Sequence, residues 1–155
     1  YKSFGYLIKS TIFLKYSRIA FTMKKVITFG SFDILHKGHE VYLKEAKGYG
    51  DYLIVVVARD ENILKFKGCK PKHDEESRLR DVKKLDFVDE AFLGDNKDIL
   101  KPIKELKPSV ICLGYDQNTI SEEALKNELK KIGINAEIVR AKPFKEHIFK
   151  SSKLK

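Results

Sequence analysis

Apolar residues along the chain fall into five short runs that alternate with amphipathic stretches. The clearest run, "DYLIVVVA" at 51–58, is apolar at nearly every position. Such a run is typical of a strand buried on both faces, because a half-exposed strand alternates apolar and polar positions. The predicted strands are 25–29, 51–58, 88–94, 108–114 and 136–141.

The stretches between these runs have the spacing of amphipathic helices. The last begins with Ser121, a favoured N-cap residue, has acidic residues in its first turn and ends on lysines and Gly133. Pro102 should lie near the first turn of its helix or cause a kink. The predicted helices are 38–50, 75–85, 96–107 and 121–133. The lysine-rich stretch 59–74 is predicted to be a loop.

Strands that alternate with helices predict right-handed β–α–β units and a parallel sheet. The predicted fold class is therefore α/β: a doubly wound, Rossmann-like parallel sheet of about five strands in a single domain. In such sheets a ligand binds beyond the carboxyl ends of the strands, near the point where the strand order reverses. The polar stretch "GSFDILHKGH" directly follows the first strand and is the first candidate for that place.

The composition is that of a basic protein with an ordinary apolar content. Its 31 Lys and Arg residues and 22 Asp and Glu residues give a net charge of +9. This excess favours anionic partners such as nucleotides or phosphorylated metabolites, without choosing among them. Cys69 and Cys112 form no CxxC pair, so we expect two free thiols in the cytoplasm rather than a disulfide framework or a thiolate zinc site.

Residues 1–22 differ in character from the rest of the chain. They are basic, contain no acidic residue and precede the single methionine, Met23. We interpret 1–22 as a non-native or disordered extension and 23–155 as the functional domain. Lysines interrupt the apolar stretch, which argues against a signal peptide. No run approaches the roughly 20 apolar residues that a membrane span needs, so no membrane partner is expected.

Two histidines, His36 and His39, stand three residues apart where the first strand gives way to a helix. A metal site, an ordinary turn and a phosphate-binding turn are the three interpretations of this pattern. Zinc would need further ligands, and the remaining histidines, His73 and His147, have no suitable spacing, so no metal ligands are predicted. A turn shaped by glycines explains Gly38 but not two histidines at the start of a helix.

A phosphate-binding turn explains more of the pattern. The N-terminus of a helix attracts phosphate through its unpaired N–H groups and its dipole. Gly38 has no side chain and allows close approach. His36 and His39, at i and i+3, lie on one face of the first turn and can donate hydrogen bonds to the same anion. Gly30 and Ser31 would place backbone N–H groups and a hydroxyl beneath it.

The stretch "GSFDILHKGH" resembles the HxGH signature of the nucleotidyltransferase superfamily, and within it the cytidylyltransferase-like family. Seven positions agree in type and context: Gly30, Ser31, Phe32, Asp33, His36, Gly38 and His39. Ser31 stands where threonine is commoner. The resemblance extends from Met23 to the C-terminus. The segments "VVVARDENILKFKGCKP" and "LGYDQN" are more similar to archaeal FAD synthases than to glycerol-3-phosphate cytidylyltransferases.

The resemblance implies transfer of a nucleoside monophosphate from a nucleoside triphosphate to a small phosphorylated acceptor, with release of pyrophosphate. It favours ATP and FMN as substrates, Mg²⁺ bound with the triphosphate, and a homodimer. CTP with glycerol-3-phosphate is the alternative pair. A non-catalytic nucleotide- or RNA-binding domain is a second alternative. RNA-binding sheets gather aromatic residues, which are spread along this chain, so nucleic acid is not an expected partner.

The resemblance also assigns further site residues, because the reaction must align two anions and neutralise their charge. One of Lys65, Lys67 and Lys70, after the second strand, would close over the β- and γ-phosphates. Arg78 matches a basic position near the phosphates. The expected catalytic set is His36, His39, Lys67 and Arg78, and Lys65 is expected to bind the nucleotide.

Two later places complete the expected nucleotide site. If the strand order reverses at the first strand, Gly114, Asp116 and Gln117 lie beside its turn and would read the base or the ribose. A plain turn stabilised by the aspartate is the alternative. Ser151 and Ser152 resemble the hydroxyl residues that open the family's last helix and meet the phosphates. Related proteins continue that helix beyond the point where this chain ends, so it would be shortened here.

Overall fold

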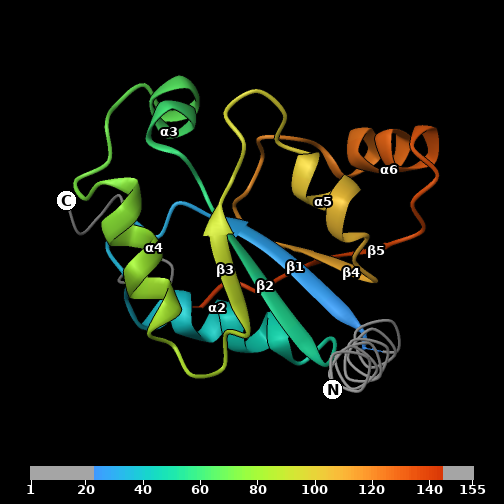
Figure 1. Cartoon of the computed structure of the whole chain (residues 1–155), viewed down its shortest axis with the longest axis horizontal. Helices are drawn as coiled ribbons and strands as arrows, with labels where there is room; N and C mark the ends of the chain where they lie inside the picture. Colours follow the sequence, from blue (N-terminus) through green and yellow to red (C-terminus); the bar gives the residue numbers. More distant parts are fainter. Residues whose placement is uncertain (1–22, 145–155) are drawn as a thin grey trace, which may run out of the picture.

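The structure, a computed structural model, describes residues 23–144 and is built on a five-stranded parallel sheet (Figure 1). The strands are β1 (Lys25–Gly30), β2 (Tyr52–Val57), β3 (Glu90–Leu93), β4 (Val110–Leu113) and β5 (Glu137–Arg140). Their order in the sheet is β3-β2-β1-β4-β5, and every adjacent pair is parallel. The predicted fold class and all five predicted strands are confirmed.

Five helices accompany the sheet within the described residues. They are α2 (Lys37–Lys47), α3 (Asp60–Lys67), α4 (Glu75–Lys83), α5 (Lys101–Leu106) and α6 (Glu122–Lys131). Figure 1 shows α2 and α4 against one face of the sheet and α5 and α6 against the other, with α3 beyond the strand ends. Within residues 23–144, no helix has both the length and the apolar character to cross a membrane.

The central strands are apolar throughout because helices cover both of their faces. Val26 and Val55 face α2 and α4, in a cluster that includes Leu43 of α2. Ile27 and Ile54 belong to the second cluster, on the side of α5 and α6. These four strand side chains are 0% exposed. Burial of each such side chain contributes about 1.5–3 kcal/mol, and this fixes the register of β1 against β2.

The strand order reverses at β1, which is the condition under which the turns after the first and fourth strands were expected to lie side by side. Strand β1 lies between β2 and β4, with Gly30 opposite Val57 and Thr28 opposite Cys112. The connection from β1 passes through α2 on one face, and the connection from β3 to β4 passes through α5 on the other. The carboxyl end of β1 is therefore the switch point, where an α/β sheet leaves room for a ligand.

The prediction of a loop over 59–74 is wrong for its first half, because α3 forms there. Its first turn has Asp60 and an adjacent glutamate, its last turn has lysines, and Gly68 ends it in the left-handed conformation with φ 74°. Only Ile63 of this helix is buried, so the apolar periodicity that identifies a helix is weak. The helix is held instead by its ends, as described below.

The predicted helix 96–107 is shorter than expected. Helix α5 begins at Lys101, with Pro102 in its first turn as predicted. The preceding residues form a turn around Asp95, whose carboxylate accepts hydrogen bonds from the backbone N–H groups of Lys97 at 2.8 Å and Asp98 at 2.7 Å. A short side chain that binds its own backbone competes with helix formation in this way.

Candidate active site

A cavity of about 480 Å³ opens at the carboxyl ends of β1, β2 and β4. This volume lies within the usual range for small-molecule sites. Residues that the sequence singled out line it: Gly30, Ser31, Phe32, His36, Gly38, His39, Lys67, Gly114, Asp116 and Gln117. The structure thus brings the turn after β1 and the turn after β4 together. Ser151, Ser152 and the extension 1–22 lie outside the described residues.

The two histidines form a stacked pair at the start of α2. Their ring centroids are 3.8 Å apart and their planes differ by 24°. The Nδ1 atom of His36 accepts a hydrogen bond from the Gly38 N–H at 3.1 Å, and the backbone N–H of His36 donates to Nδ1 of His39 at 3.3 Å. The neutral ring of His36 therefore carries its proton on Nε2, where it can donate to a ligand.

This arrangement changes the expected mode of anion binding. We expected the N–H groups at the start of α2 to meet a phosphate directly. Instead, His36 is the N-cap residue and its ring accepts the Gly38 N–H, in a capping box completed by His39. In this arrangement the imidazole of His36 covers the Gly38 N–H at the start of α2. The field of the helix N-terminus still favours negative charge there.

Both imidazoles are neutral near pH 7. Burial lowers the pKa of His36 from its ordinary value. Burial, the nearby His36 and the ammonium of Lys67 together lower the pKa of His39 to about 3, against a small opposing effect of the Ile34 carbonyl. Two stacked cations would repel each other, so the pair acts as hydrogen-bond donors rather than as charges.

The low pKa of His39 predicts an acid-sensitive fold. The folded-state pKa lies below the unfolded value of 6.5, so His39 contributes stability that is fully present above pH 6.5 and decreases as the pH falls towards 3. We expect the wild type to lose about 3 kcal/mol more than His39→Gln between pH 7 and pH 4. Urea unfolding at both pH values measures the difference, and equal losses in the two proteins would contradict it.

Phe32 holds the turn after β1 in an unusual conformation. Its φ is 49° and its side chain is 2% exposed, with the ring edge-on to His39 at 5.3 Å between centroids. A Cβ atom on Gly30 would lie 2.6 Å from the Phe32 ring, so only glycine fits beneath it. Phe32 thus lines the cavity and packs its ring against His39.

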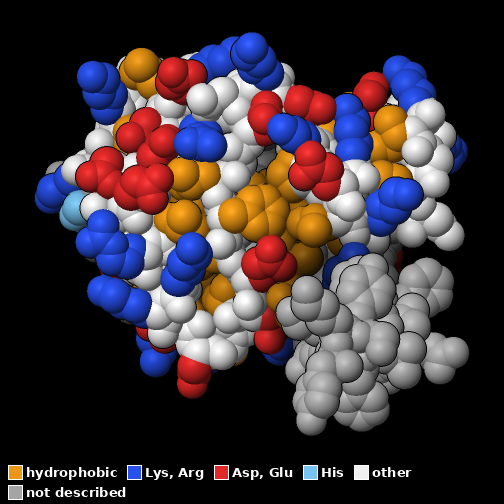
Figure 2. Space-filling model, viewed as in Figure 1, with side chains coloured by type: hydrophobic (Ala, Val, Ile, Leu, Met, Phe, Trp, Pro, Cys, Tyr) orange, Lys and Arg blue, Asp and Glu red, His pale blue; other side chains and the backbone are white. Residues whose placement is uncertain are grey.

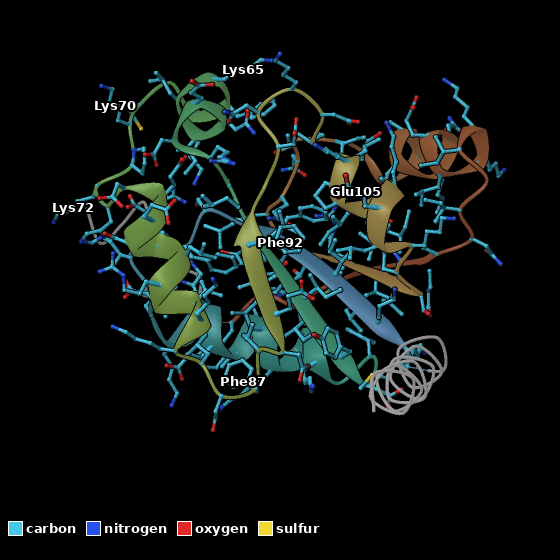
Figure 3. The ribbon with its side chains drawn as sticks, in the orientation of Figure 1. Lys65, Lys70, Lys72, Phe87, Phe92 and Glu105 are labelled. Atoms are coloured by element: carbon cyan, nitrogen blue, oxygen red, sulfur yellow. The ribbon has the colours of Figure 1, made fainter. Side chains whose placement is uncertain are left out.

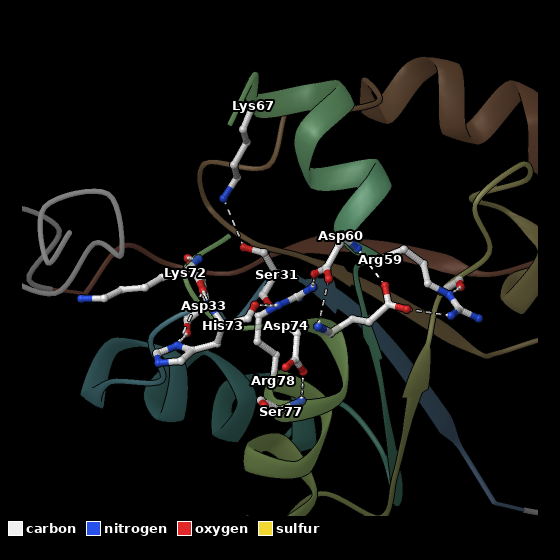
Figure 4. Close-up of polar contacts among 12 residues, drawn as sticks. Ser31, Asp33, Arg59, Asp60, Lys67, Lys72, His73, Asp74, Ser77 and Arg78 are labelled. Carbon is white, nitrogen blue, oxygen red and sulfur yellow. Dashed lines mark hydrogen bonds and ion pairs between the residues drawn. The ribbon is translucent and has the colours of Figure 1, made fainter. Parts of the chain in front are cut away.

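Asp33 is buried and bound to the segment before α4. Its carboxylate accepts hydrogen bonds from the backbone N–H groups of Lys72 and His73, each at 2.8 Å, and the His73 ring nitrogen Nδ1 lies 2.6 Å from the Asp33 carbonyl (Figure 4). Asp33 is 3% exposed and does not line the cavity. We predicted that it binds the nucleotide. The structure gives it the task of attaching the HxGH turn to the chain that leads into α4.

Arg78 is the largest fully buried side chain of the described residues and is 0% exposed. Its guanidinium donates to the Ser31 carbonyl at 2.7 Å, the His73 carbonyl at 3.0 Å and the Asp60 carboxylate at 2.6 Å (Figure 4). It does not line the cavity. The expected direct role at the phosphates therefore finds no support in this arrangement, which makes Arg78 a positioning residue beneath Ser31.

Helices α3 and α4 cap each other's N-termini. The Glu75 carboxylate accepts the backbone N–H of Asp60 at 2.9 Å, and the Asp60 carboxylate accepts the backbone N–H of Glu75 at 3.3 Å. Arg59 donates to Glu75 at 3.0 Å and so joins the same network. These contacts explain why α3 forms with only one buried apolar side chain. They also fix the orientation of α3, and therefore the position of Lys67 at its C-terminal end.

Of the three candidate lysines, Lys67 lines the cavity. Its ammonium donates to the Ser31 hydroxyl at 3.1 Å. Lys65 and Lys70 do not line the cavity. Lys65 is exposed, with its ammonium 5.7 Å from the Phe66 ring centroid, and Figure 3 shows Lys65 and Lys70 pointing away from the body of the molecule. Residues two apart on a helix point about 200° apart, so Lys65 and Lys67 cannot both face the cavity.

The turn after β4 is held by Gln117 and Arg140. The Gln117 side chain accepts the Gly114 N–H at 2.8 Å and donates to the Phe29 carbonyl of β1 at 2.6 Å. Arg140 of β5 donates to the Gly114 carbonyl at 2.7 Å and the Gln117 carbonyl at 3.0 Å. The amide of Gln117, which we expected to bind nucleotide, thus joins the two turns, and Asp116 remains a candidate ligand contact.

Two residues at this site escaped the sequence analysis. Arg140 reaches the turn because β5 pairs with β4, with Leu113 opposite Arg140, and no local signal reports such a pairing. The Tyr42 hydroxyl lies 3.3 Å from the Phe29 carbonyl and 3.2 Å from the Cys112 carbonyl, which fastens α2 to the ends of β1 and β4. The position of Tyr42 on the inner face of the predicted helix was the sequence feature that could have identified it.

Comparison with known proteins identifies the class. The family model described as "Cytidylyltransferase-like" matches residues 27–155. The chain therefore belongs to the cytidylyltransferase-like family of nucleotidyltransferases, as its HxGH turn predicted. It is 57% identical to an FAD synthase of Ferroglobus placidus over 118 residues, which are 76% of each chain. It is 50% identical to an FAD synthase of Archaeoglobus profundus, over 84% of this chain and 82% of that one.

Solved structures agree with the fold. A crystal structure described as the lipopolysaccharide core biosynthesis protein of Thermoplasma volcanium superposes with a TM-score of 0.74 and 46% sequence identity. The match covers 79% of this chain and 98% of that one. A pantoate-beta-alanine ligase of Francisella tularensis, 19% identical with a TM-score of 0.56, shares the fold.

Proposed function

We propose that the protein is an FAD synthase, which transfers the adenylyl group of ATP to FMN and releases pyrophosphate. The observation that carries the proposal is one cavity in which the stacked histidines, Lys67 and the turn after β4 converge, in a chain 44% to 57% identical to six FAD synthases. In the proposed reaction, an FMN phosphate oxygen attacks the α-phosphorus. The bond from that phosphorus to the β-phosphate oxygen breaks, and pyrophosphate leaves.

The residues of the cavity suit this reaction because it needs alignment and charge neutralisation rather than a protein nucleophile. The Nε2–H of His36 can donate to a phosphate oxygen. Because both rings are neutral, His39 stacks on His36 without charge repulsion between the two rings. Lys67, at the end of α3, supplies a positive charge, and its ammonium lies 3.1 Å from the Ser31 hydroxyl. Asp116, Asn118 and Thr119, which follow β4, line the cavity on the side where we expect the adenosine to bind.

We propose that Mg²⁺ enters with ATP, as part of the substrate. Among residues 23–144, no three or more His, Cys, Asp or Glu side chains are grouped to hold a metal ion. Magnesium prefers oxygen ligands and is commonly bound through substrate phosphates with few protein groups. The donors around the phosphate side of the cavity are imidazole, hydroxyl and ammonium groups, which fits a cation held chiefly by the triphosphate.

A substrate matrix tests the proposed function. The full chain is incubated with Mg²⁺ and either ATP or CTP, each with FMN, glycerol-3-phosphate or no acceptor, while pyrophosphate release is followed. We expect release with ATP and FMN together, and a product with the mass of FAD. Release with CTP and glycerol-3-phosphate would contradict FAD synthesis and would support a glycerol-3-phosphate cytidylyltransferase instead. Binding of ATP without release, in a folded protein, would favour a non-catalytic domain.

Lys67 and Lys65 provide a matched pair of variants on one helix. Lys67→Ala removes a charge that faces the cavity, whereas Lys65→Ala removes one that faces solvent. We expect Lys67→Ala to lower kcat/KM for FAD formation about 100-fold, because charge on the phosphates loses a partner in the transition state. Lys65→Ala should stay within about twofold of wild type. Steady-state kinetics measure both, and equal effects would contradict the assignment of Lys67.

We also propose a homodimer, which the resemblance implied. Figure 2 shows hydrophobic side chains gathered at the middle of the face where β3 lies, and Phe92 of β3 is in this region (Figure 3). Phe92 is half-buried against the second core cluster. Strand β3 is an edge strand, whose unpaired backbone groups favour association with another chain. Sedimentation velocity at several protein concentrations measures the mass of the species in solution.

We place the reaction in the cytoplasm. Cys69, which is exposed, and Cys112, which is buried, are both free thiols. Free thiols are typical of a reducing compartment. Burial raises the pKa of the Cys112 thiol to about 12, so this thiol stays protonated and unreactive at neutral pH.

A further inference from the structure

Beyond the phosphate side, the cavity continues into an apolar region. We call this region the apolar lobe and define it by Val56, Ile63, Phe66, Ile99, Leu100 and Ile103. These residues come from β2, α3, the segment after β3, and α5. Val56, Ile63 and Ile103 are 3%, 4% and 1% exposed and form a firm floor. The reaction as described so far uses none of the six.

Phe66 stands at the rim of the apolar lobe. It lines the cavity, yet 51% of it is exposed. The other large hydrophobic residue of comparable exposure in residues 23–144 is Leu64, at 42%, which is on the same helix but does not line the cavity. A flat apolar ligand that stacks on an exposed aromatic ring removes apolar surface from water, which stabilises the complex. Lys67 follows Phe66 directly, so the lobe adjoins the phosphate side.

Polar groups at the edge of the apolar lobe have protein partners. The Asn62 amide donates to the Asp95 carbonyl at 3.0 Å. The Asp95 carboxylate accepts two backbone N–H groups and lies 3.4 Å from the Lys101 ammonium. A group that enters the lobe therefore meets mainly apolar surface. On the other side of β1, the segment after β4 lines the cavity with the polar residues Asp116, Asn118 and Thr119.

The proposed reaction brings two flat groups into the cavity, and their chemistry separates them. Adenine carries hydrogen-bonding nitrogen atoms around its edge. The isoalloxazine of FMN has a dimethylbenzene end with no hydrogen-bonding group. We infer that the apolar lobe binds this end of the isoalloxazine and that the Phe66 ring stacks on it, which makes Phe66 a specificity residue for the acceptor. This inference rests on the proposed function.

Riboflavin and FMN, with Phe66 and Leu64 variants of the full chain, test the inference. Riboflavin has the isoalloxazine but no phosphate, so it reports on the lobe alone. We expect Phe66→Ala to raise both the Kd for riboflavin and the KM for FMN about tenfold, and to change the KM for ATP less than twofold. Leu64→Ala removes a similar exposed side chain outside the cavity and should change none of them. Phe66→Tyr should restore flavin binding.

Three results would overturn the inference. A rise in the KM for ATP without a change for riboflavin would place adenine in the apolar lobe. Unchanged values for both ligands, in a folded Phe66→Ala protein, would show that Phe66 contacts neither. Equal losses in Phe66→Ala and Leu64→Ala would assign the effect to α3 as a whole. Failure of the proposed function is distinct from these results, because the wild type would then form no FAD from ATP and FMN.

Discussion

We expect His36→Asn to lower kcat/KM for FAD formation about 100- to 1,000-fold while the protein stays folded. Asparagine is a favoured N-cap residue, and its side-chain oxygen can accept the Gly38 N–H that His36 Nδ1 now accepts at 3.1 Å. It has no atom at the position of Nε2. The substitution therefore removes the donor that faces the cavity and preserves the helix cap.

Two measurements separate the roles of His36. The free energy of unfolding of His36→Asn should stay within about 1 kcal/mol of wild type, as expected when one N-cap residue replaces another. Lys37→Asn is the matched control, because Lys37 is adjacent, exposed and outside the cavity, and its kcat/KM should change less than threefold. If His36→Asn kept more than a tenth of wild-type activity, the imidazole would be a cap only.

Arg78→Met should have the largest effect on stability, about 3 kcal/mol. Methionine fills part of the space but leaves the Ser31 and His73 carbonyls without their donor and the Asp60 carboxylate without its ion pair. Ser31 is then free to move relative to Lys67. A displacement of about 1 Å at a reacting site can lower the rate about 100-fold, so activity should fall even at a temperature where the variant is folded.

Two variants serve as controls for Arg78→Met: one replaces another arginine of the same helix, and the other keeps the positive charge at position 78. Arg80→Met removes an exposed arginine from α4 and should change the unfolding free energy by less than about 0.5 kcal/mol. Arg78→Lys keeps the charge but cannot reach three acceptors in one plane, so it should recover only part of the stability. Because Arg78 acts through Ser31, the folded variant should lose kcat more than affinity for ATP. Full activity in folded Arg78→Met would contradict the positioning role.

The strands and the location of the site could be predicted because their signals are local. Strand β2 is apolar at Leu53 through Val57 since helices cover both faces, and this pattern does not depend on distant residues. Right-handed β–α–β connections place α2 and α5 on opposite faces of a sheet whose strand order reverses at β1. The HxGH turn then had to lie at the switch point, where the cavity is found.

The remaining features depend on contacts between distant segments. Helix α3 is held by reciprocal capping with α4, which no pattern in 59–74 reports. Arg78 and Arg80 look alike in the sequence, and only the approach of Asp60 and Ser31 buries the first of them. Gln117 lines the cavity as expected, but its hydrogen bond to the Phe29 carbonyl of β1 joins segments 88 residues apart, and no local pattern reports that contact.

The direct test of the account is the fate of the individual phosphates of ATP. The full chain is incubated with FMN, Mg²⁺ and ATP labelled with ³²P at either the α- or the γ-phosphorus, and the products are separated. The account predicts that the α-label appears in FAD and the γ-label in pyrophosphate. Transfer of the γ-label to the flavin would contradict adenylyl transfer to FMN. So would the absence of label in FAD, if the same protein formed a labelled product in a parallel reaction with α-labelled CTP.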